Sequence, residues 1–232
     1  AVCDQRDSSA TKEASYNLLR YIYIMSSLEQ NTLKWGDLIR IHGVNLNKHD
    51  REVQGPDHFQ GVRSLQCRFT DSNIYYQKYG HFDNVNFYRE SLFQIIPHSN
   101  FDIHDELNNP KNLKYATIDA DRRRGKFEEE AEGEIESLYS NLKMKQGENV
   151  LYGAEVIFRH VESNSYMRGL LKAADTGDGA FTIEVSAQPS NQIIWKINSH
   201  RSYQKDGDPI YFDDELLIYH VSTDCFMNFA DT

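Results

Sequence analysis

The chain has few of the residues that would build a disulfide framework or a zinc site. Its 232 residues contain only three cysteines, Cys3, Cys67 and Cys225, an odd number spread over the whole length. Such a set suits a reducing compartment. The sequence also has no Asn-x-Ser/Thr glycosylation acceptor, although asparagine and serine are both common. These absences favour a domain that faces the cytosol over a secreted one.

Positive charge and long hydrophobic runs are also scarce. Lysine and arginine number 25 against 35 acidic residues, which gives a formal net charge of −10. A chain this acidic repels DNA and anionic lipid, so we expect no nucleic-acid partner and no direct membrane contact. The most apolar N-terminal stretch, residues 16–25, is too short to span a membrane and contains Arg20. Its Leu18, Ile22 and Met25 follow helical spacing, so we predict an N-terminal helical extension over residues 1–32.

Motifs for catalysis are missing as well. The sequence contains no G-x-S-x-G, H-E-x-x-H, P-loop or C-x-x-C motif. Residues 175–179 begin like a calcium-binding loop, but Ser186 stands where such a loop needs an acidic ligand, so a glycine-rich turn is predicted there. Adjacent acids such as Asp213 and Asp214 would point to opposite faces of a strand and cannot flank one bond. We therefore predict that the protein is not an enzyme and takes no cofactor or metal.

What the chain does contain is an internal repeat. Residues 152–167 have the pattern of a strand, a short polar turn and the start of a second strand. The pattern recurs from Trp35 onward and again over residues 213–227, and His42, His160 and His220 occupy matching positions. Because positions related by a threefold repeat lie apart, these histidines could not converge on a metal. We predict that their rings instead hydrogen-bond backbone groups at a hairpin.

The repeats predict a β-trefoil, a mainly β fold, with an incomplete third repeat. The predicted boundaries are 33–97 for the first repeat, 98–149 for an insertion, 150–200 for the second repeat and 201–232 for part of the third. The first two repeats close with apolar strands at residues 92–97 and 193–197. An unpaired third unit would expose strand edges, so we expect it to pair with another segment, or the parent chain to continue. A β-sandwich with inserted helices would explain the strands but not the repetition.

The insertion has the sequence of a helical hairpin, which we call the arm. Residues 126–143 form an amphipathic helix, with glutamates toward its N-terminal half and lysines at its C-terminal end. A partner helix is predicted over residues 111–124, joined to the first at Gly125. The apolar stripe supplies the predicted interaction residues Phe127, Ile135, Leu138 and Leu142. The glutamates between 128 and 136 could dock a basic partner surface or could serve solubility alone, and the sequence leaves both open.

Three local patterns resemble those of a known family. They are LKWGD at residues 33–37, LFQIIP at 92–97, and VLYG at 150–153 followed by His160, Ser163 and Tyr166. With the arm between the last two, their order resembles the MIR-type trefoil in the N-terminal, suppressor-like domain of inositol trisphosphate and ryanodine receptor calcium-release channels. Trp195 falls in that family's tryptophan strand. The resemblance covers about residues 35 to 229.

This resemblance implies a regulatory, non-catalytic N-terminal domain of an intracellular ligand-gated calcium-release channel. Such a domain modulates ligand affinity and couples subunits. It lies on the cytosolic face of the endoplasmic reticulum or a related calcium-store membrane, and its expected partners are other domains and neighbouring subunits of the same homotetramer. The alternative is a lectin-like MIR module of a mannosyltransferase-related protein, which would require a lumenal location.

Overall fold

The computed structural model of the chain describes residues 2–4, 20–25, 32–45, 62–67, 74–78, 89–109, 118–173, 180–212 and 214–228. The predicted turn at 175–179 lies outside these residues. The strands are β1 (Val2–Asp4), β2 (Arg20–Met25), β3 (Leu38–Asn45), β4 (Val62–Cys67), β5 (Ile74–Lys78), β6 (Phe93–Pro97), β7 (Glu155–His160), β8 (Ser165–Ala173), β9 (Ala180–Ser186), β10 (Ile194–Ser199), β11 (Leu216–His220) and β12 (Cys225–Asn228). The helices are α2 (Asp102–Leu107), α3 (Ile118–Lys145) and the single 3-10 turn η5 (Asn191–Ile193).

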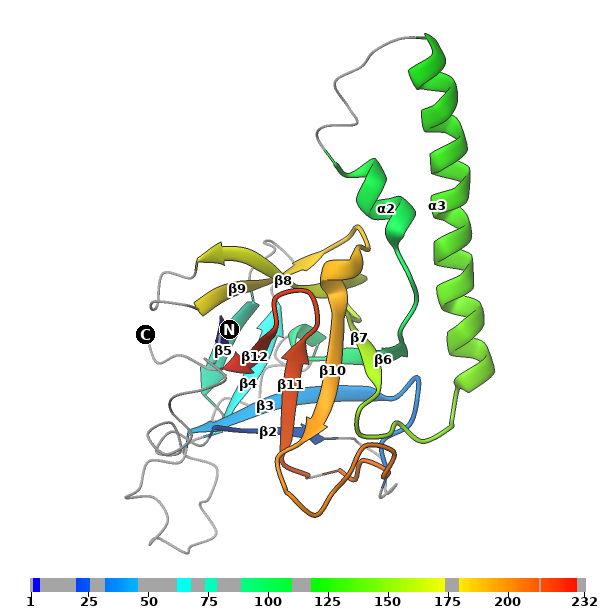
Figure 1. Cartoon of the computed structure of the whole chain (residues 1–232). Helices are drawn as coiled ribbons and strands as arrows, with labels where there is room; N and C mark the ends of the chain where they lie inside the picture. Colours follow the sequence, from blue (N-terminus) through cyan, green and yellow to red (C-terminus); the bar gives the residue numbers. More distant parts are fainter. Residues whose placement is uncertain are drawn as a thin grey trace, which may run out of the picture.

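Antiparallel pairing joins six strands into a closed ring in the order β2–β3–β6–β7–β10–β11 and back to β2. Three further strand pairs, β4–β5, β8–β9 and β12–β1, form hairpin-like pairs beside this ring. Both helices of the arm stand to one side of it (Figure 1). The protein is therefore mainly β, with the β-trefoil architecture and the helical insertion between the first and second repeats that the sequence predicted.

Alternation along the ring strands fills the interior with apolar side chains. In β11, for example, Leu216, Ile218 and His220 are buried while the residues between them are partly exposed. This period of two is what a strand with one face toward a core requires. The same alternation in the other ring strands contributes Ile39, Ile41, Phe93, Ile95, Val156, Phe158, Trp195 and Ile197 to one core.

A ring of three backbone hydrogen bonds ties the three repeats together at one end of the barrel. The Leu33 N–H donates to the Ile210 carbonyl over 2.8 Å, and the Ile210 N–H donates to the Val150 carbonyl over 3.1 Å. The Val150 N–H donates to the Leu33 carbonyl over 2.8 Å and so closes the ring. All three residues are fully buried. Each repeat thus uses one donor and one acceptor that water cannot reach, which is the arrangement expected around a threefold axis.

The same kind of turn follows each member of this ring. In each turn the N–H of the fourth residue donates to the carbonyl of the first, in the pairs Asp37 to Lys34, Ala154 to Leu151 and Asp214 to Tyr211. The second residue of each turn is an aromatic one that packs in the core, Trp35, Tyr152 or Phe212. In the first two turns the third residue is glycine with a positive φ, +92° at Gly36 and +83° at Gly153. Glycine tolerates this conformation at no steric cost, so the sequence pattern and the turn geometry agree.

The repeated histidines hold the turns between paired strands. The ring of His160 contacts the Glu90 carbonyl through Nε2 at 3.1 Å and the Ser163 hydroxyl through Nδ1 at 2.8 Å. His220 makes the same pair of contacts, with the Gln192 carbonyl at 2.7 Å and the Thr223 hydroxyl at 2.7 Å. A carbonyl can only accept, so Nε2 carries the proton and Nδ1 accepts from the hydroxyl. The predicted role of these two rings at a hairpin is confirmed.

Burial keeps these rings neutral. It lowers the pKa of His160 and of His220, against the smaller opposing effect of the carbonyls that their rings contact. His42, the matching residue of the first repeat, is 1% exposed. Burial and the nearby Arg40 charge lower the pKa of His42 to about 4.

The N-terminal segment is where the sequence prediction was wrong. The structure has strand β2 from Arg20 to Met25, inside the segment predicted as helix from Leu18, Ile22 and Met25. The segment is rich in aromatic and β-branched residues, and β3 on one side and β11 on the other offer it backbone partners, which outweighs helical spacing. Within the described residues, the third repeat has the strands β11 and β12, which pair with β2 and β1, in line with the expectation that it would pair with another segment.

The predicted joint of the arm at Gly125 was also wrong. A single helix, α3, runs through Gly125 from Ile118 to Lys145. One glycine in a helix costs only about 1 kcal/mol relative to alanine, too little to end a helix this long. The first helix of the arm is instead α2, which precedes Pro110. Within the described ranges, no helix has the length and hydropathy of a membrane span.

Replacing Gly169 in β8 with alanine should destabilise the fold by about 1–3 kcal/mol. An added Cβ would lie 2.7 Å from two ring atoms of His220, which is fully buried and cannot move aside. The matched control is Gly133→Ala, because that glycine has no atom within 4 Å of an added Cβ and lies inside α3. The control should stabilise the chain by up to about 1 kcal/mol. Urea unfolding compares the two, and equal midpoints for Gly169→Ala and the parent would contradict the packing described.

Acid should destabilise the chain from about pH 6.5 downward. An unfolded histidine takes up its proton near pH 6.5, whereas His42 in the fold does so only at about 4. The unfolded chain therefore binds more protons across this window, and stability that is present above it is lost as pH falls. His42 alone accounts for a loss on the order of 3 kcal/mol. Asp37 and Asp105, whose pKa values burial raises, act in the opposite direction.

Urea titrations at several pH values between about 7.5 and 4.5 measure this loss. His160→Gln removes one of the three buried repeat histidines whose pKa is lowered while keeping a polar side chain, so its free energy of unfolding should fall less steeply as the pH falls. Equal pH dependence in the parent and in His160→Gln would show that the His160 ring takes up its proton as readily in the fold as in the unfolded chain.

Candidate functional site

The arm packs against the trefoil through a second, smaller core. Leu138 of α3 is fully buried in it, and Leu142, one turn further on, is partly buried against the same cluster. The trefoil contributes side chains from β6, β7, β8 and η5, and the segment before α2 contributes Phe101. These are Ile96, Ile157, Tyr166 and Ile193. The arm is thus fixed to the trefoil by apolar contacts along the C-terminal half of α3.

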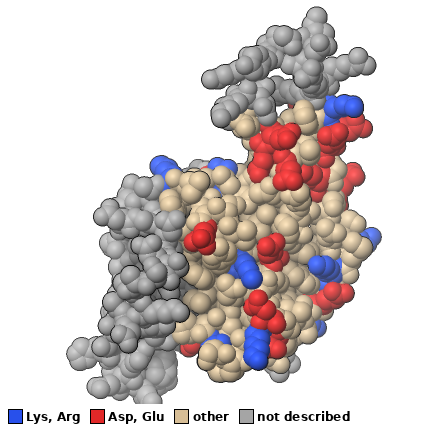
Figure 2. Space-filling view, viewed as in Figure 1, with Lys and Arg blue, Asp and Glu red and all other residues tan. Residues whose placement is uncertain are grey.

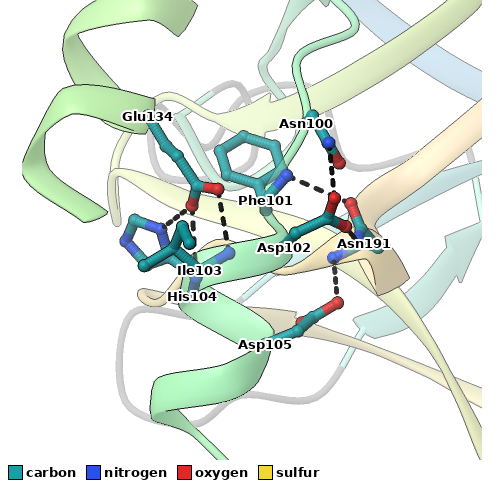
Figure 3. Close-up of polar contacts among 8 residues, drawn as sticks. All are labelled: Asn100, Phe101, Asp102, Ile103, His104, Asp105, Glu134 and Asn191. Carbon is teal, nitrogen blue, oxygen red and sulfur yellow. Dashed lines mark hydrogen bonds and ion pairs between the residues drawn. The ribbon is translucent and has the colours of Figure 1, made fainter. Parts of the chain in front are cut away.

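Glu134 of α3 supplies the cap that α2 lacks (Figure 3). Its two carboxylate oxygens accept from the backbone N–H of Ile103 at 2.9 Å and of His104 at 3.2 Å. One of them also accepts from Nδ1 of the His104 ring at 2.7 Å. The first N–H groups of a helix have no partner inside it, and a carboxylate satisfies them with favourable charge. Glu134 therefore joins the two helices of the arm.

The other side of α2 is held by Asn191 of η5. The Asn191 side chain donates from Nδ2 to the Asp102 carboxylate at 2.9 Å, and its backbone N–H donates to the Asp105 carboxylate at 3.2 Å. Burial raises the pKa of Asp105, and the charges of Asp102 and Glu134 act the same way, against the hydrogen bonds from Asn191. This helix therefore lies between α3 and the second repeat, bonded to both.

A third contact lies in the C-terminal half of α3, at the residue after Leu138. The Arg159 guanidinium, from β7, donates to the Tyr139 hydroxyl at 3.3 Å and lies 5.9 Å from the centre of the Tyr139 ring. The same guanidinium donates to Gln94 of β6 and to Asn164 in the β7–β8 turn. A hydrogen bond from Tyr166, followed by the effect of Arg159, lowers the pKa of Tyr139. An arginine fork is suited to joining several acceptors at once.

The four predicted interaction residues occupy different environments. Leu138 is fully buried within the chain, so it is used by the trefoil and has no surface left for a partner. Leu142 is partly buried beside it. Phe127 and Ile135 lie nearer the projecting end of α3 and are partly exposed. A contact between this stripe and another subunit stays a prediction, which now concerns Phe127 and Ile135.

The polar residues of this junction were not predicted from the sequence. A usable signal existed for Glu134, which lies three residues after Ala131 and four before Leu138 and so shares the buried face of α3. A charge on that face needs a partner, which α2 supplies. No comparable signal existed for His104 or Asn191, because α2 is only six residues long and η5 only three.

The outward face of the arm is acidic. Figure 2 shows Asp and Glu side chains gathered on the arm, whereas the trefoil face in view carries mixed, scattered charge. The exposed glutamates of α3 are Glu128, Glu129, Glu130, Glu132 and Glu136. Across the residues that the structure describes, no group of three or more histidine, cysteine or acidic side chains is placed to hold a metal. A face of this kind can attract a positively charged surface.

Comparison with known families adds an independent finding. The family described as "Inositol 1,4,5-trisphosphate/ryanodine receptor" matches residues 80–232, about two thirds of the chain. The match includes the arm and the whole of the second repeat. No individual curated protein matches the chain.

Replacing Glu134 with alanine should lower the free energy of unfolding by about 1–3 kcal/mol. The change leaves the N–H groups of Ile103 and His104 and the His104 ring without their acceptor in a partly buried site. Glu136→Ala is the matched control, since it makes the same change on the exposed side of the same helix. Urea unfolding of both variants measures the difference, and equal losses would mean that the cap contributes nothing.

Proposed function

Because the chain belongs to the inositol 1,4,5-trisphosphate/ryanodine receptor family, we propose that it is a regulatory, non-catalytic N-terminal domain of an intracellular ligand-gated calcium-release channel. In this role the trefoil is a rigid support, and the arm is the element that contacts a neighbouring subunit or an adjoining domain. The domain modulates ligand affinity through these contacts. The family match favours this hypothesis over the lectin-like alternative.

The observation that supports the proposal is that α3 is held along one face and exposed along the other. One face of α3 is held by Leu138, Glu134 and Tyr139, while the opposite face presents glutamates to solvent. If this 28-residue helix served only the domain core, it would be expected to bury one face along its whole length. Instead, Phe127 in its N-terminal half and Ile135 near its middle are partly exposed. Contact areas that combine an apolar centre with a charged rim are typical of protein interfaces.

The proposed partners and location follow from the family. The partners are neighbouring subunits and other domains of the same channel, which we propose is a homotetramer. The proposed location is the cytosolic face of the endoplasmic reticulum or a related calcium-store membrane. Among the described residues, Cys67 and Cys225 are buried and form no disulfide, which agrees with a reducing environment.

A photo-crosslinking experiment in the full-length protein tests the role of the arm. A benzophenone side chain at Phe127 should give covalent pairs of chains, because the proposed contact lies within its reach. The same group at Tyr203, an exposed residue in the loop before β11, is the control and should not. Similar yields of paired chains from the two positions would count against the arm as the contact element.

Charge reversal provides a second arm of this test. Glu128→Lys with Glu132→Lys should lower the yield from position 127 on the order of tenfold, and more strongly at low salt. Glu148→Lys with Asp206→Lys reverses two exposed acids on the trefoil and should leave the yield unchanged. An unchanged yield after both reversals would show that the acidic face takes no part in the contact.

A further inference from the structure

Asn191 has an unusual set of bonds for so small a residue, since each of its four polar atoms bonds a different segment or residue. Three of the bonds go to α2 and the residue before it. Nδ2 and the backbone N–H donate to Asp102 and Asp105, and Oδ1 accepts from the Phe101 N–H at 3.2 Å. The fourth group, the backbone carbonyl, accepts from the Ser222 hydroxyl at 2.8 Å in the turn between β11 and β12.

That turn, residues 221–224, rests on η5 and the start of β10 through two more bonds. The His220 ring contacts the Gln192 carbonyl at 2.7 Å, and the Val221 N–H donates to the Ile194 carbonyl at 3.2 Å. The outer side of the turn, including Val221 and Ser222, is exposed. A single 3-10 turn therefore lies between the arm and an exposed turn of the third repeat, and is bonded to both.

In the second repeat, the segment before β6 takes the place that η5 has in the third. There the turn of residues 161–164 bonds the segment before β6 in the same way, His160 to Glu90 and Val161 to Leu92. The residue that corresponds to Asn191 is Arg89, and its side chain bonds Glu162 of the turn itself at 3.0 Å. In the third repeat the backbone of Asn191 takes over the bond to the turn, and the side chain is free to hold α2.

We propose that Asn191 is a positioning residue that couples the arm to the exposed turn of residues 221–224, so that a displacement of the arm changes the stability of that turn. The chain of contacts runs from α3 through Glu134 to α2, from α2 through Asn191 to η5, and from η5 to the turn. The two exposed surfaces, arm and turn, are then energetically linked, and a partner bound at one alters the other. This inference rests on the proposed function only in supplying a partner for the arm.

Hydrogen exchange in the isolated chain tests the coupling without any partner. Glu134→Ala loosens α2 from α3, and we expect amide exchange over residues 216–228 to rise about threefold or more. In the Asn191→Ala background the same change should have no further effect on that segment. Residues 62–67 of β4, whose buried Leu65 and Cys67 lie in the main core and not in the cluster beside the arm, are the internal control and should keep their exchange rate in every variant.

Conservative variants separate positioning from simple packing. Asn191→Asp keeps the shape of the side chain but places a carboxylate against Asp102, so it should disturb the turn as Asn191→Ala does. Adding Asp102→Asn restores a donor opposite an acceptor and should return the exchange of residues 216–228 to the parent rate. If the Glu134→Ala variant does not fold, Asp102→Asn alone can replace it in the exchange experiment, because it perturbs the arm more mildly.

Two results would overturn the proposal. One is faster exchange in α2 of the Glu134→Ala variant with no change over residues 216–228. The other is an effect of Glu134→Ala on the turn that persists when Asn191 is alanine. Neither result depends on crosslinking at Phe127, so failure of this coupling and failure of the arm as a subunit contact are separate outcomes.

Discussion

The hydrogen-bond ring of Leu33, Val150 and Ile210 is the constraint on which the rest of the structure depends. Its donors and acceptors are backbone groups, fully buried, and leaving any of them unpaired would cost about 1–3 kcal/mol. No side chain can take their place, so each repeat has to start at the same depth and angle. These three residues therefore set the register of each repeat. The positions of the aromatic turns, the inward-facing strand residues and the buried histidines follow from that register.

The same constraint explains how corresponding residues of the repeats can have different roles. The repeats hold their paired strands and turns by equivalent backbone contacts. A side chain in one repeat can therefore bind a different partner without disturbing the other repeats. Arg89 and Asn191 illustrate the difference, because the first closes its own turn and the second holds a helix outside the barrel. The inserted arm is tolerated for the same reason, since it connects β6 to β7 without altering their pairing.

Much of the fold could be predicted because short stretches of the sequence indicate its strands and turns. The strand-turn-strand pattern of residues 152–167 and the apolar strands at 92–97 and 193–197 indicated elements that the structure contains as β7, β8, β6 and β10. Strand β2 could not be predicted, because its helical spacing is a local signal while its pairing with β3 and β11 is not. The junction of the arm was out of reach for a similar reason. Its residues belong to elements of three and six residues, whose positions are decided by distant contacts such as that of Glu134.

The pairing of β1 and β2 with the third repeat has a consequence for how the chain acquires its structure. Val2 pairs with Asn228 and Ile22 with Leu216, so the barrel closes through contacts between residues far apart in sequence. Contacts of this kind slow folding, since a large loop must be ordered before they form. The first two repeats can assemble during synthesis, but the barrel can close only once β11 and β12 have left the ribosome. Until then the edges of β2 and β10, the two ring partners of β11, are open to other chains, which makes the last step of folding the one most exposed to aggregation.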